Sequence, residues 1–184
     1  GYHGARDGES NESFAGADLM IGQRMSDNWD LSFGLQGGAQ RFDTAIDVLD
    51  VDRLLYSLTA ARRYANGLRI SIGAIGGNDS EREAGSPYGN SKLGVRATLG
   101  LPLGRGGRLA ASLGSLRSDY DGLFFGASRE DTQVSGYLEF EFRDVLVKGL
   151  SVAPRVRYVD NDSDIALYKY DRSEIGVGLK WTGR

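Results

Sequence analysis

Few side chains in this sequence could act as a catalytic base or nucleophile. The chain contains a single histidine, His3, and no cysteine, so a thiolate metal site and a disulfide framework are both excluded. His3 lies in the polar stretch 1–12, which we expect to be exposed. A hydrolytic site needs its base held within hydrogen-bond distance of the nucleophile, and an exposed chain end does not provide this. The sequence therefore predicts a protein that is not an enzyme and that holds no cofactor.

Asp160, Asp162 and Asp164 alternate as the first ligands of a calcium-binding loop do. An EF-hand loop that begins at Asp160 requires glycine at its sixth position and glutamate at its twelfth, but Ile165 and Asp171 stand there. We therefore predict no EF-hand. The three aspartates remain candidates for a looser divalent-cation site on a loop, and a solvated polar loop is the alternative.

A larger set of charged residues and tyrosines shares one parity in the sequence. In several stretches every second residue is apolar, and the residues between are charged, polar or glycine, which places the two kinds on opposite faces of a sheet. We expect the polar face to line the lumen of a barrel, where its charges form cross-strand ion pairs or border a pore. The tyrosines of this face would pack on the wall or contact a passing chain. The predicted lumen-facing residues are Arg69, Arg96, Glu139, Glu141, Arg143, Arg155, Arg157, Tyr168, Tyr170, Arg172, Glu174 and Lys180.

The elements that would position these residues are β-strands. Residues 174–181, for example, read EIGVGLKW, in which large apolar residues alternate with charges and glycines. Short connections alternate with long ones, so tight turns would lie at one end of the strands and long loops at the other. Asn66-Gly67 predicts a hairpin turn of the primed type. Period-two patterns predict nine strands, at 13–24, 28–41, 53–64, 68–78, 91–101, 107–118, 131–143, 150–160 and 167–181.

Strands of this length joined by alternating short and long connections are typical of outer-membrane β-barrels. Phe42, Tyr120 and Tyr158 lie near the long-loop ends of their strands. Aromatic girdles at the two lipid interfaces would produce such a distribution, and the predicted girdle at the short-turn end consists of Trp29, Tyr64, Phe142 and Trp181.

We predict an all-β, antiparallel up-and-down (meander) β-barrel of the transmembrane type. This single domain would cover residues 13–184, after an exposed polar segment over residues 1–12. A soluble barrel with its apolar face inside, which binds an apolar ligand, is an alternative with the same alternation. The formal net charge of −3 provides no basic face for nucleic acid, so we expect no nucleic-acid partner.

The odd number of predicted strands has consequences for the edges of the sheet. Single-chain bacterial barrels have an even number of strands, and nine strands leave two unpaired edges. We therefore expect the chain to be the C-terminal part of a larger barrel. The alternative is a structural subunit that self-associates through its open strand edges into an extracellular oligomer or filament.

Residues 164–179, DIALYKYDRSEIGVGL, resemble the closing strand of the surface lipoprotein assembly modifier family. Its pattern Tyr-x-Tyr-x-Arg-x-Glu-x-x-Val-x-Leu is matched from Tyr168 to Leu179. The resemblance implies a C-terminal barrel in the bacterial outer membrane that helps to move proteins or lipoproteins to the cell surface. It also implies contact with outer-membrane lipid and with a translocated protein or lipoprotein client. The periplasmic tetratricopeptide-repeat domain of the family has no counterpart in this sequence.

Overall fold

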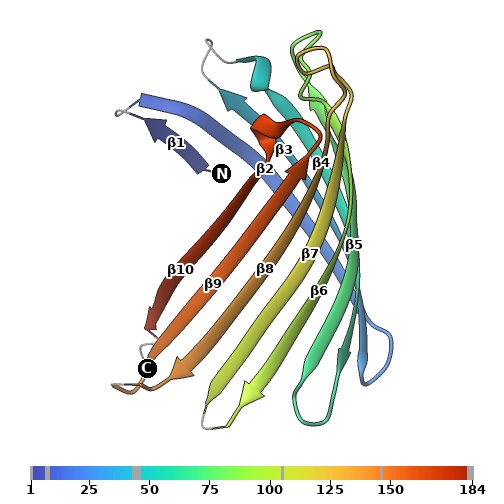
Figure 1. The fold of residues 1–184 in the computed structure, drawn as a ribbon. Coiled ribbons are helices and arrows are strands. Elements are labelled where there is room, and N and C mark those ends of the chain that lie inside the picture. Colours follow the sequence, from blue (N-terminus) through green and yellow to red (C-terminus); the bar gives the residue numbers. More distant parts are fainter. Residues whose placement is uncertain (1, 7–8, 43–46, 105, 146, 182–184) are drawn as a thin grey trace.

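The chain forms one antiparallel sheet. The computed structural model describes residues 2–6, 9–42, 47–104, 106–145 and 147–181, and for residues 2–6 and 9–12 it describes the backbone alone. In this part of the chain ten strands follow one another in sequence order across the sheet (Figure 1). They are β1 (Tyr2–Arg6), β2 (Glu9–Arg24), β3 (Trp29–Phe42), β4 (Val51–Arg63), β5 (Arg69–Glu81), β6 (Asn90–Leu103), β7 (Gly107–Tyr120), β8 (Glu130–Arg143), β9 (Leu150–Ser163) and β10 (Tyr170–Trp181).

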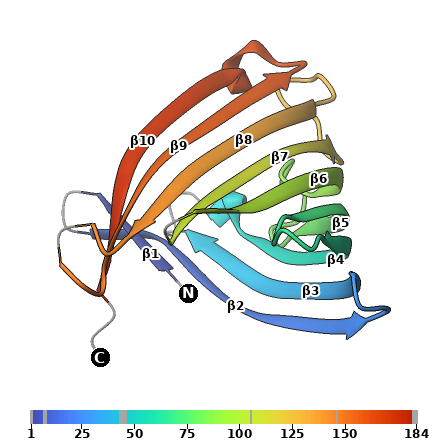
Figure 2. The same cartoon turned by 90° about the horizontal axis from the view of Figure 1, so that it is seen from below.

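This topology confirms the predicted fold class, an all-β, antiparallel meander of the transmembrane-barrel type. The sheet is curved into a trough and does not close (Figure 2). The first and last strands of the sheet order, β1 and β10, are not hydrogen-bonded to each other. The described part of the chain thus forms a curved wall with two free edges.

The nine predicted strands correspond to β2–β10, and the differences lie at the chain ends. The segment 1–12 contains β1 and the first residues of β2, and β1 pairs with β2 from Tyr2↔Phe14 onward. Backbone pairing does not depend on side-chain hydrophobicity, so a polar stretch can form a strand that alternation does not reveal. Exposure of the side chains of residues 1–12, His3 included, lies outside the described residues.

The last predicted strand, 167–181, begins later than expected. Ala166–Tyr168 form a 3₁₀ turn, η2, and β10 starts at Tyr170. The amide N–H of Tyr168 donates to the carbonyl of Ile165, and the side-chain amide of Asn161 donates to the carbonyl of Tyr168 at 2.9 Å. These bonds hold Tyr168 in a turn beyond the strand, so its predicted place within a strand is wrong. Its side chain lines a hollow with Lys92 and Tyr170 of the concave face, and its lumen-facing role stays a prediction.

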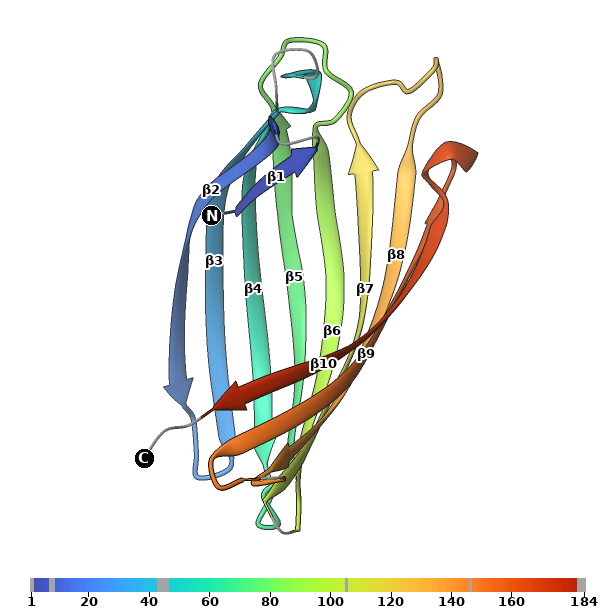
Figure 3. The same cartoon turned by 90° about the vertical axis from the view of Figure 1, so that its left-hand side faces the viewer.

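From β2 to β9 the connections alternate in length as predicted, whereas those of β8–β9 and β9–β10 are equally long. Those of β2–β3, β4–β5, β6–β7 and β8–β9 lie at one end, and the long ones of β3–β4, β5–β6 and β7–β8 lie at the other (Figure 3). In the β4–β5 turn Gly67 has φ +80°, whereas Asn66 has no positive φ. A primed turn of type I′ needs positive φ at both residues, so this turn is of another type. Neither of the two 3₁₀ turns, η1 (Asp47–Leu49) and η2, is long enough to cross a membrane.

Side chains are distributed inside out. Among the residues whose side chains the structure describes, the buried apolar ones are Val51, Ala61, Phe124 and Val159, whereas nine buried residues are polar or charged. Large apolar side chains are exposed on the convex face instead; Ile72 and Val177 in different strands are 64% and 62% exposed. Because water disfavours such a face, the sheet is suited to an apolar surrounding on its convex side. A soluble barrel with its apolar face inside does not fit this distribution.

Candidate functional site

Strand register places the predicted lumen-facing residues on one face, the concave one. Residues opposite each other in neighbouring strands share a face, and Glu174 lies opposite Arg157, which lies opposite Tyr137. The row continues through Ser112 to Thr98. By the same parity the concave face carries Arg69, Arg96, Glu139, Glu141, Arg143, Arg155, Arg157, Tyr170, Arg172, Glu174 and Lys180.

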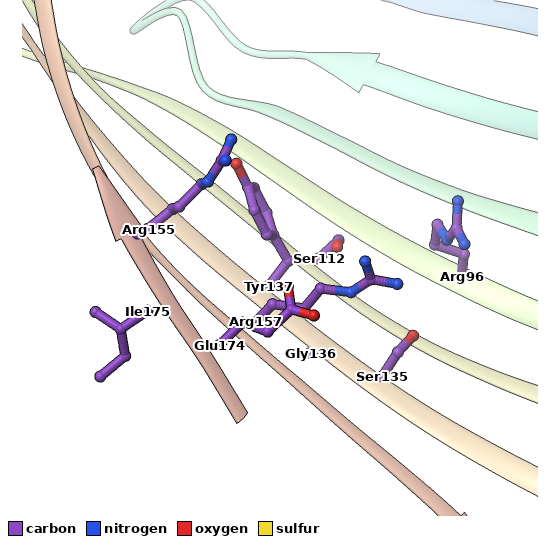
Figure 4. A pocket seen from close by; sticks show the side chains of 10 residues that line it. Arg96, Ser112, Ser135, Gly136, Tyr137, Arg155, Arg157, Glu174 and Ile175 are labelled. Carbon is purple, nitrogen blue, oxygen red and sulfur yellow. The ribbon is translucent and has the colours of Figure 1, made fainter. Parts of the chain in front are cut away.

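A hollow of about 470 Å³ lies on this face between β6 and β10. We call it the arginine hollow, because the guanidinium groups of Arg96, Arg155 and Arg157 line it (Figure 4). Three hydroxyl groups and one carboxylate complete its polar lining, while Ile175 points away from it; they belong to Ser112, Ser135, Tyr137 and Glu174. The hollow thus brings together side chains from β6, β7, β8, β9 and β10.

Glycines make room for two of the arginines. Gly114 lies opposite Arg96, and Gly176 lies opposite Arg155. A Cβ atom at Gly176 would lie 3.4 Å from Nε of Arg155, and one at Gly114 would lie 3.3 Å from Oγ of Ser135. A side chain at either position would therefore crowd the hollow, so the glycines of the alternating pattern have a local role here.

The expected cross-strand ion pairs do not form in the arginine hollow. Glu174 lies directly opposite Arg157, but its carboxylate pairs with Arg172, two residues earlier on the same face of β10. Glu139 lies opposite Arg155, but it accepts a hydrogen bond of 2.5 Å from the hydroxyl of Tyr137, which Arg155 also contacts. In the part of the chain that the structure describes, no carboxylate oxygen is within 4.0 Å of a guanidinium nitrogen of Arg96, Arg155 or Arg157.

Elsewhere on the concave face, several cations are paired. Asp79 is buried and accepts hydrogen bonds from Arg53 at 2.8 and 2.9 Å and from Lys92 at 2.5 Å. Arg143 pairs with Glu141 at 2.8 Å near the short-turn end. The wall therefore has acidic partners for cations at both ends, and the arginine hollow lies between them.

At the long-loop end, Arg129 is enclosed by aromatic rings. Its guanidinium carbon lies 4.1 Å from the ring centroid of Tyr120, 4.9 Å from that of Phe124 and 3.4 Å from that of Tyr168. Asp131 binds it through two hydrogen bonds of 3.0 and 2.5 Å. We call these five residues the loop clasp, because they join the β7–β8 loop to the η2 turn. Alternation predicts none of these contacts. Of the five residues, the sequence pattern indicates only Tyr120, as a girdle aromatic, and Tyr168, as a lumen-facing residue.

The loop clasp lies beyond the apolar band of the convex face, because outward positions beside it, Arg117 and Glu130, are charged and paired at 2.5 Å. Burial raises the pKa of the Tyr120 hydroxyl to about 12, so its ring stays neutral beside the cation. For Asp131, burial acts to raise the pKa, but the hydrogen bonds from Arg129 and Ser163 outweigh it, and the net pKa is lowered. The pair is therefore fully ionised at neutral pH.

The predicted short-turn girdle lies on the convex face. Trp29 is 44% exposed and Trp181 63%, and Tyr64 and Phe142 are also exposed. The guanidinium carbon of Arg62 lies 5.6 and 4.9 Å from the ring centroids of Trp29 and Tyr64. This arrangement agrees with a girdle, which stays a prediction.

The girdle predicted at the long-loop end differs from the structure. By register, Phe42 and Tyr120 share the parity of the concave face, and Tyr158 alone of the three points outward. Tyr120 is drawn inward because its ring packs on Arg129. The position of an aromatic residue near the end of a strand therefore did not show whether its side chain lies on the convex or the concave face.

The aspartates considered for a divalent cation are not gathered into a ligand set. Asp162 pairs with Lys169 at 2.7 Å and also accepts from the backbone N–H of Ser163. Within the described residues, no group of three acidic, histidine or cysteine side chains is placed to hold a metal ion. Asp160, Asp162 and Asp164 thus belong to a polar loop end.

Comparison with known proteins gives one family and one fold. The sequence model of a family described as surface lipoprotein assembly modifier matches residues 3–182. No curated protein sequence matches significantly. The crystal structure of Acinetobacter baumannii OccAB4 superposes with a TM-score of 0.52 at 13% identity, over 95% of this chain and 47% of that chain. The chain thus spans about half the length of OccAB4, and at this identity the likeness concerns the fold alone.

Proposed function

The chain belongs to the surface lipoprotein assembly modifier family, and we propose that its sheet is a wall of an outer-membrane β-barrel that assists the export or assembly of proteins at the cell surface. The family match covers residues 3–182, so it includes all ten strands apart from Tyr2. In this role the chain performs no catalysis. Its client is a protein or lipoprotein.

The inside-out distribution of side chains is the observation that carries this proposal. Large apolar residues are exposed on the convex face of every central strand, for example Leu58 in β4 (52%) and Leu113 in β7 (63%). Their transfer from water to lipid is favourable by roughly 25 cal/mol for each Å² of apolar surface. Concave polar residues would then border an aqueous path past which a client segment moves.

The proposal is tested with the full-length protein in cells that make a surface lipoprotein of the same bacterium. Protease added to intact cells should degrade the lipoprotein only when the full-length protein is present. A variant with Leu113→Arg, which places a charge on the convex face, should lose this effect together with its membrane insertion. Equal protease sensitivity of the lipoprotein with and without the protein would refute the role in export.

The free strand edges support a second candidate, self-association into an extracellular oligomer or filament. β10 offers twelve residues along one open edge, and Ile175 on it is 85% exposed. Light scattering separates the two candidates. A regular, very large particle that needs no detergent favours the structural role, and dispersion at one chain per micelle in detergent favours the membrane role.

A further inference from the structure

The arginine hollow carries positive charge that the sheet itself does not neutralise. We infer that it is a binding site for an oxyanion, namely a carboxylate or a phosphate group. The inference rests on the side chains of the concave face and does not depend on the proposed role in export.

The donors of the hollow match an oxyanion in kind. The planar guanidinium fork donates two parallel hydrogen bonds to a carboxylate or phosphate, and Arg96, Arg155 and Arg157 supply three such forks. Hydroxyl groups of Ser112 and Ser135 lie beside them and can rotate to donate as well. Glu174, the acid of the lining, is already paired with Arg172.

The arginines are placed at an electrostatic cost that a bound anion would remove. Arg155 and Arg157 lie two residues apart on one strand face, which separates their Cα atoms by roughly 7 Å. Two like charges at this separation repel each other. The acids opposite them, Glu139 and Glu174, bind other groups and make no ion pair with either arginine. They therefore offset this repulsion only in part, and the arrangement serves a ligand better than it serves stability.

The hollow is also accessible and large enough. All three arginines are exposed, so a solute can reach them from the trough. A volume of about 470 Å³ admits a phosphate ion or a glutamate side chain with part of its hydration shell. A concave wall focuses the field of its charges and raises the local concentration of counter-ions.

The neighbouring cations show that the hollow is an exception. Arg53 and Lys92 share Asp79, and Arg63 binds Asp30 at 2.7 Å. These pairs hold neighbouring strands together and leave little net charge to attract a ligand. Arg108 and Lys180 also have no ion pair within the described residues, but they lie near the short-turn end, whereas Arg96, Arg155 and Arg157 face one hollow.

The test is isothermal titration calorimetry of the full-length protein in detergent micelles at physiological salt. The probes are inorganic phosphate and a tri-glutamate peptide. Binding of phosphate alone assigns the site to small anions, and binding of the peptide assigns it to acidic polypeptide; either supports the inference. Absence of heat from both probes overturns it.

Variants locate the binding. Arg96→Gln combined with Arg157→Gln removes two forks, and affinity should fall at least tenfold. The charge-matched control is Arg69→Gln with Lys180→Gln, on the same face but outside the hollow, which should change affinity less than threefold. Arg96→Lys with Arg157→Lys keeps the charge and should restore part of the affinity. Equal losses in both Gln double variants would overturn the site, and circular dichroism verifies that each variant is folded.

Discussion

Replacement of Ile72 by arginine tests the lipid-facing role of the convex face most sharply. Ile72 lies near the middle of the apolar stretch of β5, with Ile70 below it and Ala74 above it. Its cross-strand neighbours are Ala60 and Ala97, and 64% of its own surface is exposed. A longer side chain therefore meets no steric obstacle, and the effect of Ile72→Arg depends on the surrounding solvent alone.

The two possible surroundings predict different free energies of unfolding. An arginine at the midplane of the lipid face of a barrel costs about 2–4 kcal/mol, falling towards zero near the interfaces. On a water-exposed surface the same change would cost at most about 0.5 kcal/mol. The difference corresponds to a factor of roughly ten or more in the unfolding equilibrium constant.

The assay is equilibrium unfolding by urea in phospholipid vesicles, with Gln36→Arg as the matched control. Gln36 lies on the concave face of β3, opposite Asp18, where a new cation has both water and an acid nearby. Ile72→Arg should destabilise by about 2–4 kcal/mol and Gln36→Arg by less than about 0.5 kcal/mol. Comparable effects of the two substitutions would refute the assignment of the faces.

Three further predictions concern the loop clasp and a turn. Asp131→Asn should cost about 3–5 kcal/mol, because it leaves the buried Arg129 without its anion. In the unchanged protein the pKa of Asp131 is lowered, so the stabilisation by this pair is complete above about pH 4 and is lost as the pH falls through the lowered pKa. The free energy of unfolding, measured between pH 2 and 7, should therefore decrease at low pH in the unchanged protein by an amount that is missing in Asp131→Asn. Phe124→Leu removes three edge-on ring contacts and should cost at least about 1 kcal/mol and speed proteolysis of the β7–β8 loop; unchanged cleavage would contradict the clasp. Gly67→Ala should cost about 1–2 kcal/mol in thermal unfolding because φ is +80° and a Cβ atom would lie 2.7 Å from Cγ of Pro102; an unaltered melting temperature would show that the turn adapts.

Strand existence and face were predictable because both depend on local alternation. The stretch from Glu174 to Trp181 specifies its two faces by itself, and its register with β9 pairs each apolar residue with another apolar residue or proline. The short and long connections likewise follow from where the alternation stops. This is why β2–β10 agree with the prediction to within a few residues.

Contacts between side chains were not predictable, because each charged side chain has several oppositely charged residues within reach, and the sequence does not show which of them it pairs with. Arg157 and Glu174 lie directly opposite each other on β9 and β10 and would be expected to pair, yet Glu174 pairs with Arg172. Arg129 could not be identified from alternation, because its partners come from loops whose paths are not periodic. The strand β1 was not predicted for a related reason: its residues show no apolar alternation, and its pairing with β2 is made by the backbone.

Spin labelling at a single introduced cysteine measures the solvent of the convex face directly, because residues 1–184 contain no cysteine. Ile72→Cys and Gln36→Cys are labelled with a nitroxide in phospholipid vesicles, in a protein whose cysteines outside these residues, if any, are replaced by serine. The label at position 72 should be relaxed by oxygen, which dissolves in lipid, and the label at position 36 by a water-soluble nickel chelate. Equal relaxation of both labels by the nickel chelate would contradict a convex face in lipid.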